Sequence, residues 1–197
     1  MCFKNILDDD DAYLSKIDKL IVREWIMTNY HINGDLTISN DFVADCSEHV
    51  HVKNKNIELL TNGLFRWGEV GESFYCDGCD KLTSLKGAPE KVGRCFGCSG
   101  CSGLTTHKGA PKKTDNGFYC NGCENLTSLK GAPEEVGWSF VCSYCKNLTS
   151  LEGAPEKVGR LFDCDNCPNL KITDSDREKY KLHKYSAYIP QITNENI

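Results

Sequence analysis

The stretch that decides the fold is Phe118–Ser139, FYCNGCENLTSLKGAPEEVGWS, because similar stretches precede and follow it at a constant interval. Each Cys-x-x-Cys pair begins 22 residues after the previous one. The same period holds for a phenylalanine two residues before each pair and a leucine three residues after it. The pairs are Cys76/Cys79, Cys98/Cys101, Cys120/Cys123, Cys142/Cys145 and Cys164/Cys167. Residues 71–170 therefore form an uninterrupted array of five units.

A unit of 22 residues is too short for two packed helices, and it suits one coil of a solenoid. Phe118 and Cys120 are two residues apart, so they share one face of a short strand. Tyr119 and Asn121 then point to the opposite face. One coil cannot bury its apolar residues alone, so we expect the coils to stack with their strands in parallel. The strands are expected to begin near residues 73, 95, 117, 139 and 161.

The unit resembles the leucine-rich repeat family in its cysteine form. In the pattern L-x-x-L-x-L-x-x-[N/C]-x-L, Phe74 and Cys76 take the second and third apolar places. Cys79 takes the Asn/Cys place, and Leu82 follows after one extra residue. The first apolar place departs from the pattern, because Gly71 occupies it. The resemblance implies an α/β solenoid of parallel strands, leucine-rich-repeat-like, with about five coils.

Two short motifs of the repeat also look like those of particular leucine-rich arrays. The motifs L-T-S-L and A-P-x-x-V are most similar to the short repeats of bacterial effectors and of proteins encoded by bacteriophages and large viruses. This resemblance implies a viral (phage) or bacterial protein that binds a host or partner protein.

The segments beside the array are predicted to cover its ends. Residues 12–28 predict a helix with one apolar stripe, formed by Leu14, Ile17, Ile21 and Trp25. Two short apolar segments, 36–38 and 42–43, are candidate strands of a hairpin. The predicted organisation is an N-terminal cap at 1–48, a degenerate first repeat at 49–70, five repeats at 71–170, and a C-terminal cap and tail at 171–197.

The C-terminal segment predicts a polar helix over residues 174–187. Asp174 or Ser175 is expected to open it, because such side chains accept hydrogen bonds from free N–H groups in the first turn. The segment 188–190 is expected to help cover the last coil.

Charge and hydropathy exclude two classes of protein. The formal net charge is −5, and no segment has the basic excess that neutralises phosphates, so we expect no nucleic-acid partner. No apolar run approaches the roughly 18–20 residues of a membrane-spanning helix, so we expect no membrane partner. The N-terminal sequence MCFKNILDDDDAYLS has no apolar core of a classical secretory signal, and we expect a cytoplasmic protein.

The 13 cysteines allow two interpretations. Cys76-x2-Cys79-x18-Cys98-x2-Cys101 fits the spacing of a four-cysteine zinc site. However, the pairs recur at core positions, where a buried thiol acts as a small apolar group and a weak donor. We favour structural, reduced thiols that donate to turn carbonyls, with no cofactor and no metal ligands. Cys95 lies outside the pair pattern and is expected to face outward.

Other candidate residues favour structure over catalysis. His49 and His51 alternate with valines on one strand face, and they are interpreted as solvated surface residues in preference to a metal site. His107 replaces the leucine of the repeat and is interpreted as a lapse in the core pattern. The sequence has no phosphate-binding loop and no Ser/His/Asp or Cys/His arrangement at a recognisable spacing, so we expect no enzyme and no catalytic residues.

The outward residues of stacked strands form columns on one surface, which predicts a protein-binding face. Tyrosines among small and acidic residues suit protein recognition, because tyrosine combines large area with a hydrogen-bonding tip. Gly97 between two tyrosines is expected to leave a shallow notch. The predicted contact residues are Tyr75, Asp77, Tyr119, Asn121, Val141, Tyr144, Asp163 and Asp165. The alternatives are a structural virion or assembly component, and a zinc-binding CxxC module.

Overall fold

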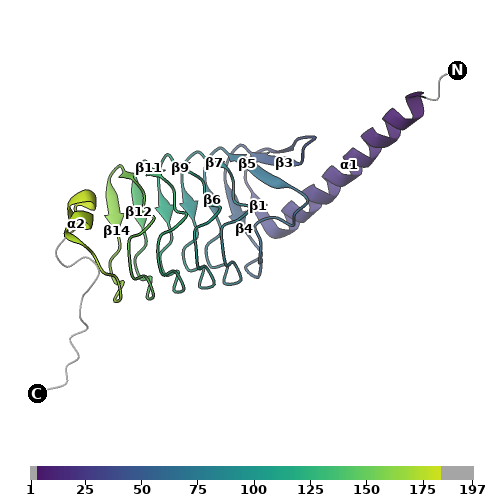
Figure 1. Cartoon of the computed structure of the whole chain (residues 1–197). Coiled ribbons are helices and arrows are strands. Elements are labelled where there is room, and N and C mark those ends of the chain that lie inside the picture. The colour runs from purple at the N-terminus through teal and green to yellow at the C-terminus, as the bar shows by residue number, and fades with distance from the viewer. Residues whose placement is uncertain (1–3, 183–197) are drawn as a thin grey trace, which may run out of the picture.

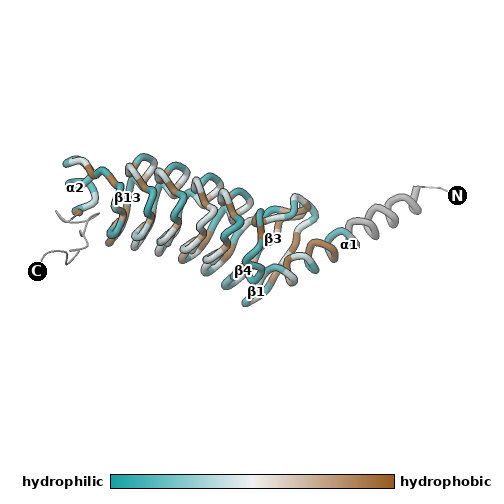
Figure 2. The backbone as a smooth tube through the Cα atoms, turned by 90° about the horizontal axis from the view of Figure 1, so that it is seen from below, coloured by the Kyte–Doolittle hydropathy of each residue, from teal (hydrophilic) through white to brown (hydrophobic). Residues whose placement is uncertain are grey.

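The fold is a β-solenoid with a helix at each end, as Figure 1 shows. The structure, a computed structural model, describes residues 4–182, and of these the side chains of Lys16 and of residues 18–182. Two sheets of seven strands each run along the solenoid. The core lies between them, and Figure 2 shows how hydrophobic and hydrophilic residues alternate along each coil.

The first sheet contains the predicted strands. Its order is β1-β4-β6-β8-β10-β12-β14, and every pairing from β4 onward is parallel. These strands are β1 Tyr30–Ile32, β4 Val50–Val52, β6 Phe74–Tyr75, β8 Phe96–Gly97, β10 Phe118–Tyr119, β12 Ser139–Val141 and β14 Leu161–Asp163. Each strand of the five-unit array starts within one residue of the predicted position, so the expected stacking is confirmed.

The second sheet was not predicted. Its order is β13-β11-β9-β7-β5-β3-β2. These strands are β2 Leu36–Ile38, β3 Val43–Cys46, β5 Arg66–Val70, β7 Lys91–Val92, β9 Lys113–Thr114, β11 Glu135–Val136 and β13 Lys157–Val158. In the units, the segment after Gly-Ala-Pro is thus hydrogen-bonded to the neighbouring coils. The array itself, residues 71–170, contains no helix. As expected, β2 and β3 pair as an antiparallel hairpin.

A ladder of stacked phenylalanines fills one side of the core. Neighbouring ring centroids in the series lie 5.2–5.5 Å apart. That distance is close to the roughly 4.7–4.9 Å separation of paired strands, so each ring lies over the ring of the next coil. The series is Phe74, Phe96, Phe118, Phe140 and Phe162.

The cysteine pairs form a second ladder in the core. All ten cysteines of the pairs are fully buried and free. The second thiol of a pair donates to the carbonyl of the first cysteine one coil earlier, as from Cys101 Sγ to Cys76 O at 3.1 Å and from Cys123 Sγ to Cys98 O at 3.1 Å. Burial raises the pKa of Cys120 well above its ordinary value, so the thiol stays protonated. The predicted thiol-to-carbonyl bonds are confirmed.

A close approach of neighbouring coils explains the glycine at the first apolar place. At Gly93 an added Cβ would overlap the carbonyl oxygen of Gly71, and at Gly159 it would overlap that of Gly137. In these two coils the corner between the sheets therefore has no room for the apolar side chain of the family pattern, whereas the third unit carries Asp115 at this place.

Helix α1 (Lys4–Asn29) is longer than predicted and uses a different face. Val22 and Ile26 are buried against the first coil, whereas Ile21 is 48% exposed. The predicted stripe is therefore wrong at Ile21, while Leu14 and Ile17 lie outside the described side chains. The contact face is rotated because α1 runs outward from the array, and only its end beside β1 meets the core (Figure 1). Trp25 joins that contact at 5.7 Å from the Phe65 ring.

Helix α2 (Asp174–Tyr180) begins one residue after its N-cap, Thr173. The Thr173 hydroxyl accepts the N–H of Asp176 at 3.1 Å, and the Asp176 carboxylate accepts the N–H of Thr173 at 2.9 Å. The cap is thus Thr173, and not Asp174 or Ser175 as predicted. Tyr180 stacks on Phe162 at 4.1 Å, which continues the aromatic ladder beyond the last coil. Residues 183–190 of the predicted cap lie outside the described residues.

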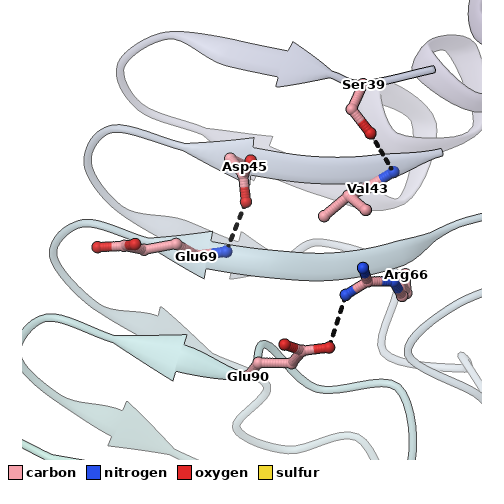
Figure 3. A network of polar contacts seen from close by, with 6 residues as sticks. All are labelled: Ser39, Val43, Asp45, Arg66, Glu69 and Glu90. Carbon is pink, nitrogen blue, oxygen red and sulfur yellow. Dashed lines mark hydrogen bonds and ion pairs between the residues drawn. The ribbon is translucent and has the colours of Figure 1, made fainter. Parts of the chain in front are cut away.

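Polar contacts tie the first coils together on the outside of the second sheet (Figure 3). The Asp45 carboxylate on β3 accepts the N–H of Glu69 on β5 at 2.6 Å. The Arg66 guanidinium forms an ion pair with the Glu90 carboxylate at 2.6 Å. Similar ion pairs recur down this side, so we interpret it as a charge-balanced, solvated face.

Candidate interaction surface

The predicted contact residues of the strands lie in one file across the first sheet. In the backbone register, Tyr75 faces Gly97, Gly97 faces Tyr119, and Tyr119 faces Val141. Asp163 follows at the end of the file. The parallel register therefore brings together the file that the repeat predicts.

Tyr75 is half-buried and covers the expected notch. A Cβ at Gly97 would come within 2.6 Å of Tyr75 Cδ1, so the tyrosine ring lies over this glycine. The hypothesis of a notch at Gly97 is therefore wrong. On its other side, Tyr75 stacks on His51 with ring centroids 4.8 Å apart. Burial raises the pKa of Tyr75, which keeps its hydroxyl protonated.

The Tyr119 ring points in a different direction from the Tyr75 ring. A Cβ at Gly117 would overlap the Tyr119 hydroxyl, so the ring lies beside Gly117, toward the corner of the coil. Burial and, to a smaller extent, the nearby Cys95 thiol raise the pKa of both Tyr75 and Tyr119, and Cys95 itself is half-buried instead of fully outward. The two tyrosines thus flank one thiol on the outer face.

The carboxylates of the surface are partly used for internal hydrogen bonds. Asp77 Oδ1 accepts the N–H of Ser99 in the next coil at 2.6 Å, and burial raises the pKa of Asp77. Asp163 Oδ1 accepts the Ser143 hydroxyl at 2.5 Å and the N–H of Asp165 at 3.0 Å. These residues therefore give the face a negative charge that is held in place.

The formal charges in the outward columns of the first sheet are all negative. The three outward columns hold three aspartates and no lysine or arginine. The columns are Ser73, Cys95, Gly117, Ser139 and Leu161, then Tyr75, Gly97, Tyr119, Val141 and Asp163, then Asp77, Ser99, Asn121, Ser143 and Asp165. Lys55 lies beside these columns, and its Nζ donates to Asp77 O at 2.7 Å.

Tyr144 is an unusual turn residue. It is 61% exposed, and its φ of 62° lies in the left-handed region. Gly78, Gly100 and Gly122 hold the same turn position and also have positive φ. A tyrosine there costs of order 1 kcal/mol in backbone strain without adding to the core, which favours a role at the surface. Asn121, in the preceding coil, is half-buried, and its Oδ1 has no hydrogen-bond partner in the described residues.

Trp138 is the surface residue that the sequence reasoning missed. It is 48% exposed, and the Arg160 guanidinium lies 4.6 Å from its ring centroid. The other units carry Glu72, Arg94, Asn116 and Arg160 at this position. A tryptophan at a polar position of the repeat was the available signal.

Three histidines gather at the start of the file. His31 faces His51 in the antiparallel pair of β1 and β4, and the rings of His49 and His51 lie 6.3 Å apart. Burial and the neighbouring His49 lower the pKa of His51. Within residues 4–182, no group of three or more His, Cys, Asp or Glu side chains is arranged to hold a metal ion.

His107 is fully buried, and neither ring nitrogen meets a hydrogen-bond partner at good geometry. Its ring contacts Phe118 edge-on at 5.4 Å. The residue therefore belongs to the core and does not reach the outer face.

Comparison of the chain with protein-family models, with curated protein sequences and with solved structures finds no match. The resemblance to leucine-rich repeats accordingly stays a prediction. In the described part of the chain, neither helix is long and apolar enough to cross a bilayer.

Proposed function

We propose that this protein is a non-enzymatic interaction module that binds a partner protein through the outer face of its first sheet. The observation that carries the proposal is the file formed by Tyr75, Tyr119, Val141 and Asp163. Half-exposed tyrosines and fixed carboxylates on a rigid sheet offer area and hydrogen bonds with little loss of side-chain freedom on binding.

The two ends of the array belong to the same proposal. The contacts of Val22, Ile26 and Trp25 with the first coil, and of Tyr180 with Phe162, support a capping role for both helices. Capped ends would leave the sheet face as the binding surface.

The compartment and the kind of partner are further parts of the proposal. All twelve cysteines among residues 4–182 are free, and free thiols persist in a reducing compartment, which supports a cytoplasmic protein. The resemblance to short-repeat arrays of phages, large viruses and bacterial effectors supports a partner from a host cell.

One observation favours a second candidate, a structural or assembly component that acts through its ends. Leu20, Ile21 and Met27 of α1 are each about half exposed or more. Exposed apolar residues on a helix that runs away from the array are suited to contact with another protein.

The test is affinity capture from the native cell extract with four forms of the full chain. The double change Tyr75→Ala with Tyr119→Ala removes two side chains that would each contribute about 2 kcal/mol at the centre of a contact. We expect it to abolish capture of the main partner that the unchanged protein retains.

The matched control changes Lys91→Ala with Lys157→Ala, two exposed residues on the second sheet. It should capture the partner normally. Circular dichroism should show that both variants remain folded. Retention of the partner by the tyrosine variant, together with its loss on Ile21→Asp in α1, would replace the proposal by the second candidate.

A further inference from the structure

A hollow lies at the corner between the two sheets, beside the proposed binding face. Its volume is about 600 Å³, and its lining includes Arg94, Asp115, Asn116, Tyr119 and Trp138. At this corner the third unit carries Asn116 and Gly117 where the next unit carries Trp138 and Ser139.

The walls of the hollow are aromatic and rich in hydrogen-bond acceptors. Trp138 and Tyr119 supply ring surfaces, and the Tyr119 hydroxyl, the Asn116 amide and the Asp115 carboxylate supply acceptor oxygens. The Arg160 guanidinium lies over one face of the Trp138 ring, 4.6 Å from its centroid, so a second planar cation would stack on the opposite face.

The two charges in the lining are not equally available. The Arg94 guanidinium is held by the Glu72 carboxylate at 2.6 Å, which offsets its positive charge. The Asp115 carboxylate is farther from its partner, 3.4 Å from Lys113 Nζ, and both side chains are exposed. The Asp115 carboxylate is therefore more available than the Arg94 guanidinium to bind a group of the partner.

The adjoining sheet face also favours a positively charged partner. Its columns contain Asp77, Asp163 and Asp165 and no basic residue, and the whole chain has a net charge of −5. A partner segment that crosses both surfaces would therefore be favoured by positive charge.

We infer that the hollow is an anchor site for an arginine side chain of a basic protein segment. The guanidinium stacks on Trp138 and donates to the Asp115 carboxylate, while the rest of the segment follows the acidic face past Tyr119. The inference rests on the proposed function, because it names the chemistry of the partner for that surface.

The experiment selects peptides from a random library displayed on phage, with the full-length protein immobilised. The most enriched peptide is then synthesised, and its affinity is measured by titration calorimetry. We expect arginine in the enriched sequences. Trp138→Ala, or alanine in place of the peptide's arginine, should each weaken binding about tenfold or more. The two changes together should add little to either one, because both remove the same contact.

Charge-matched variants distinguish binding in the hollow from non-specific attraction between a basic peptide and an acidic protein. Asp115→Asn should weaken binding several-fold, whereas Glu156→Gln, which removes one exposed negative charge elsewhere, should leave it unchanged. Trp138→Phe keeps a ring and should retain part of the affinity, which guards against a folding effect.

Three outcomes would overturn the inference: enriched peptides without basic residues, affinity indifferent to Trp138→Ala, or no enriched peptide. These outcomes are distinct from failure of the proposed function. If the double tyrosine change still abolishes capture of the native partner, the interaction face stands and only the arginine anchor is wrong.

Discussion

His107 is an unusual core residue, because its imidazole is fully buried with no well-aligned hydrogen bond. Burial lowers its pKa from 6.5 to about 4. Between these values the unfolded chain binds a proton that the folded chain does not. Stability should therefore fall as the pH drops from about 6.5 to about 4, by about 3 kcal/mol from this group, and level off outside that window.

The variant His107→Leu restores the residue type found at Leu85 and Leu129 in the neighbouring units. It should add about 1–3 kcal/mol at neutral pH, since no polar nitrogen is left buried, and it should flatten the pH dependence. Urea unfolding at several pH values measures both effects. His31→Asn, a change at an exposed histidine, is the control. An unaltered pH dependence in His107→Leu would show that another group causes it.

The thiol ladder gives a second prediction at this scale. Cys123→Ala should destabilise the protein by about 1–2 kcal/mol, because it leaves a small cavity and removes the donor to Cys98 O. Cys95→Ala, at a half-buried position outside the pairs, should cost less. Thermal unfolding under reducing conditions compares the two. Equal losses would mean that a thiol of the ladder contributes no more to stability than the half-buried Cys95.

Among the elements, α1 shows where the sequence prediction succeeded and where it did not. The helix itself was predictable from its apolar spacing, but its contact face was not, because several overlapping apolar stripes run along it. Only the meeting with the first coil selects Val22 and Ile26 over Ile21. Ile26→Ala should therefore cost about 2–4 kcal/mol, whereas Ile21→Ala should stay within about 0.5 kcal/mol. Chemical denaturation of the two variants tests this assignment, which similar losses would contradict.

The strands, too, were only partly predictable from the sequence. The 22-residue period predicted the starts and register of the first sheet, because Phe and Cys alternate there. The second sheet escaped prediction, since each of its strands within the array has only two residues and only one faces inward. Trp138 was likewise overlooked as a surface residue, although it breaks the polar pattern of its position. Its hollow is also lined by Asn116 one coil away, and this proximity becomes visible only when the coils are stacked.

At the scale of the whole molecule, the solenoid separates two faces of different character. The second sheet carries ion pairs such as Arg66–Glu90 and Lys157–Glu135, which balance its charge. The outward columns of the first sheet carry aromatic rings and aspartates without lysine or arginine. A partner that recognises one face would therefore be guided to the first sheet by charge and anchored there by rings.

The central claim is that binding takes place on that first sheet. It is tested most directly by hydroxyl-radical footprinting of the full chain, free and in complex with the partner captured from the native extract. The account predicts that oxidation of Tyr75, Tyr119 and Tyr144 falls at least about twofold in the complex. Met27, half exposed on α1, should be oxidised equally in both states. Protection of Met27 with unchanged oxidation of the three tyrosines would contradict the claim and place the contact at the end of the array.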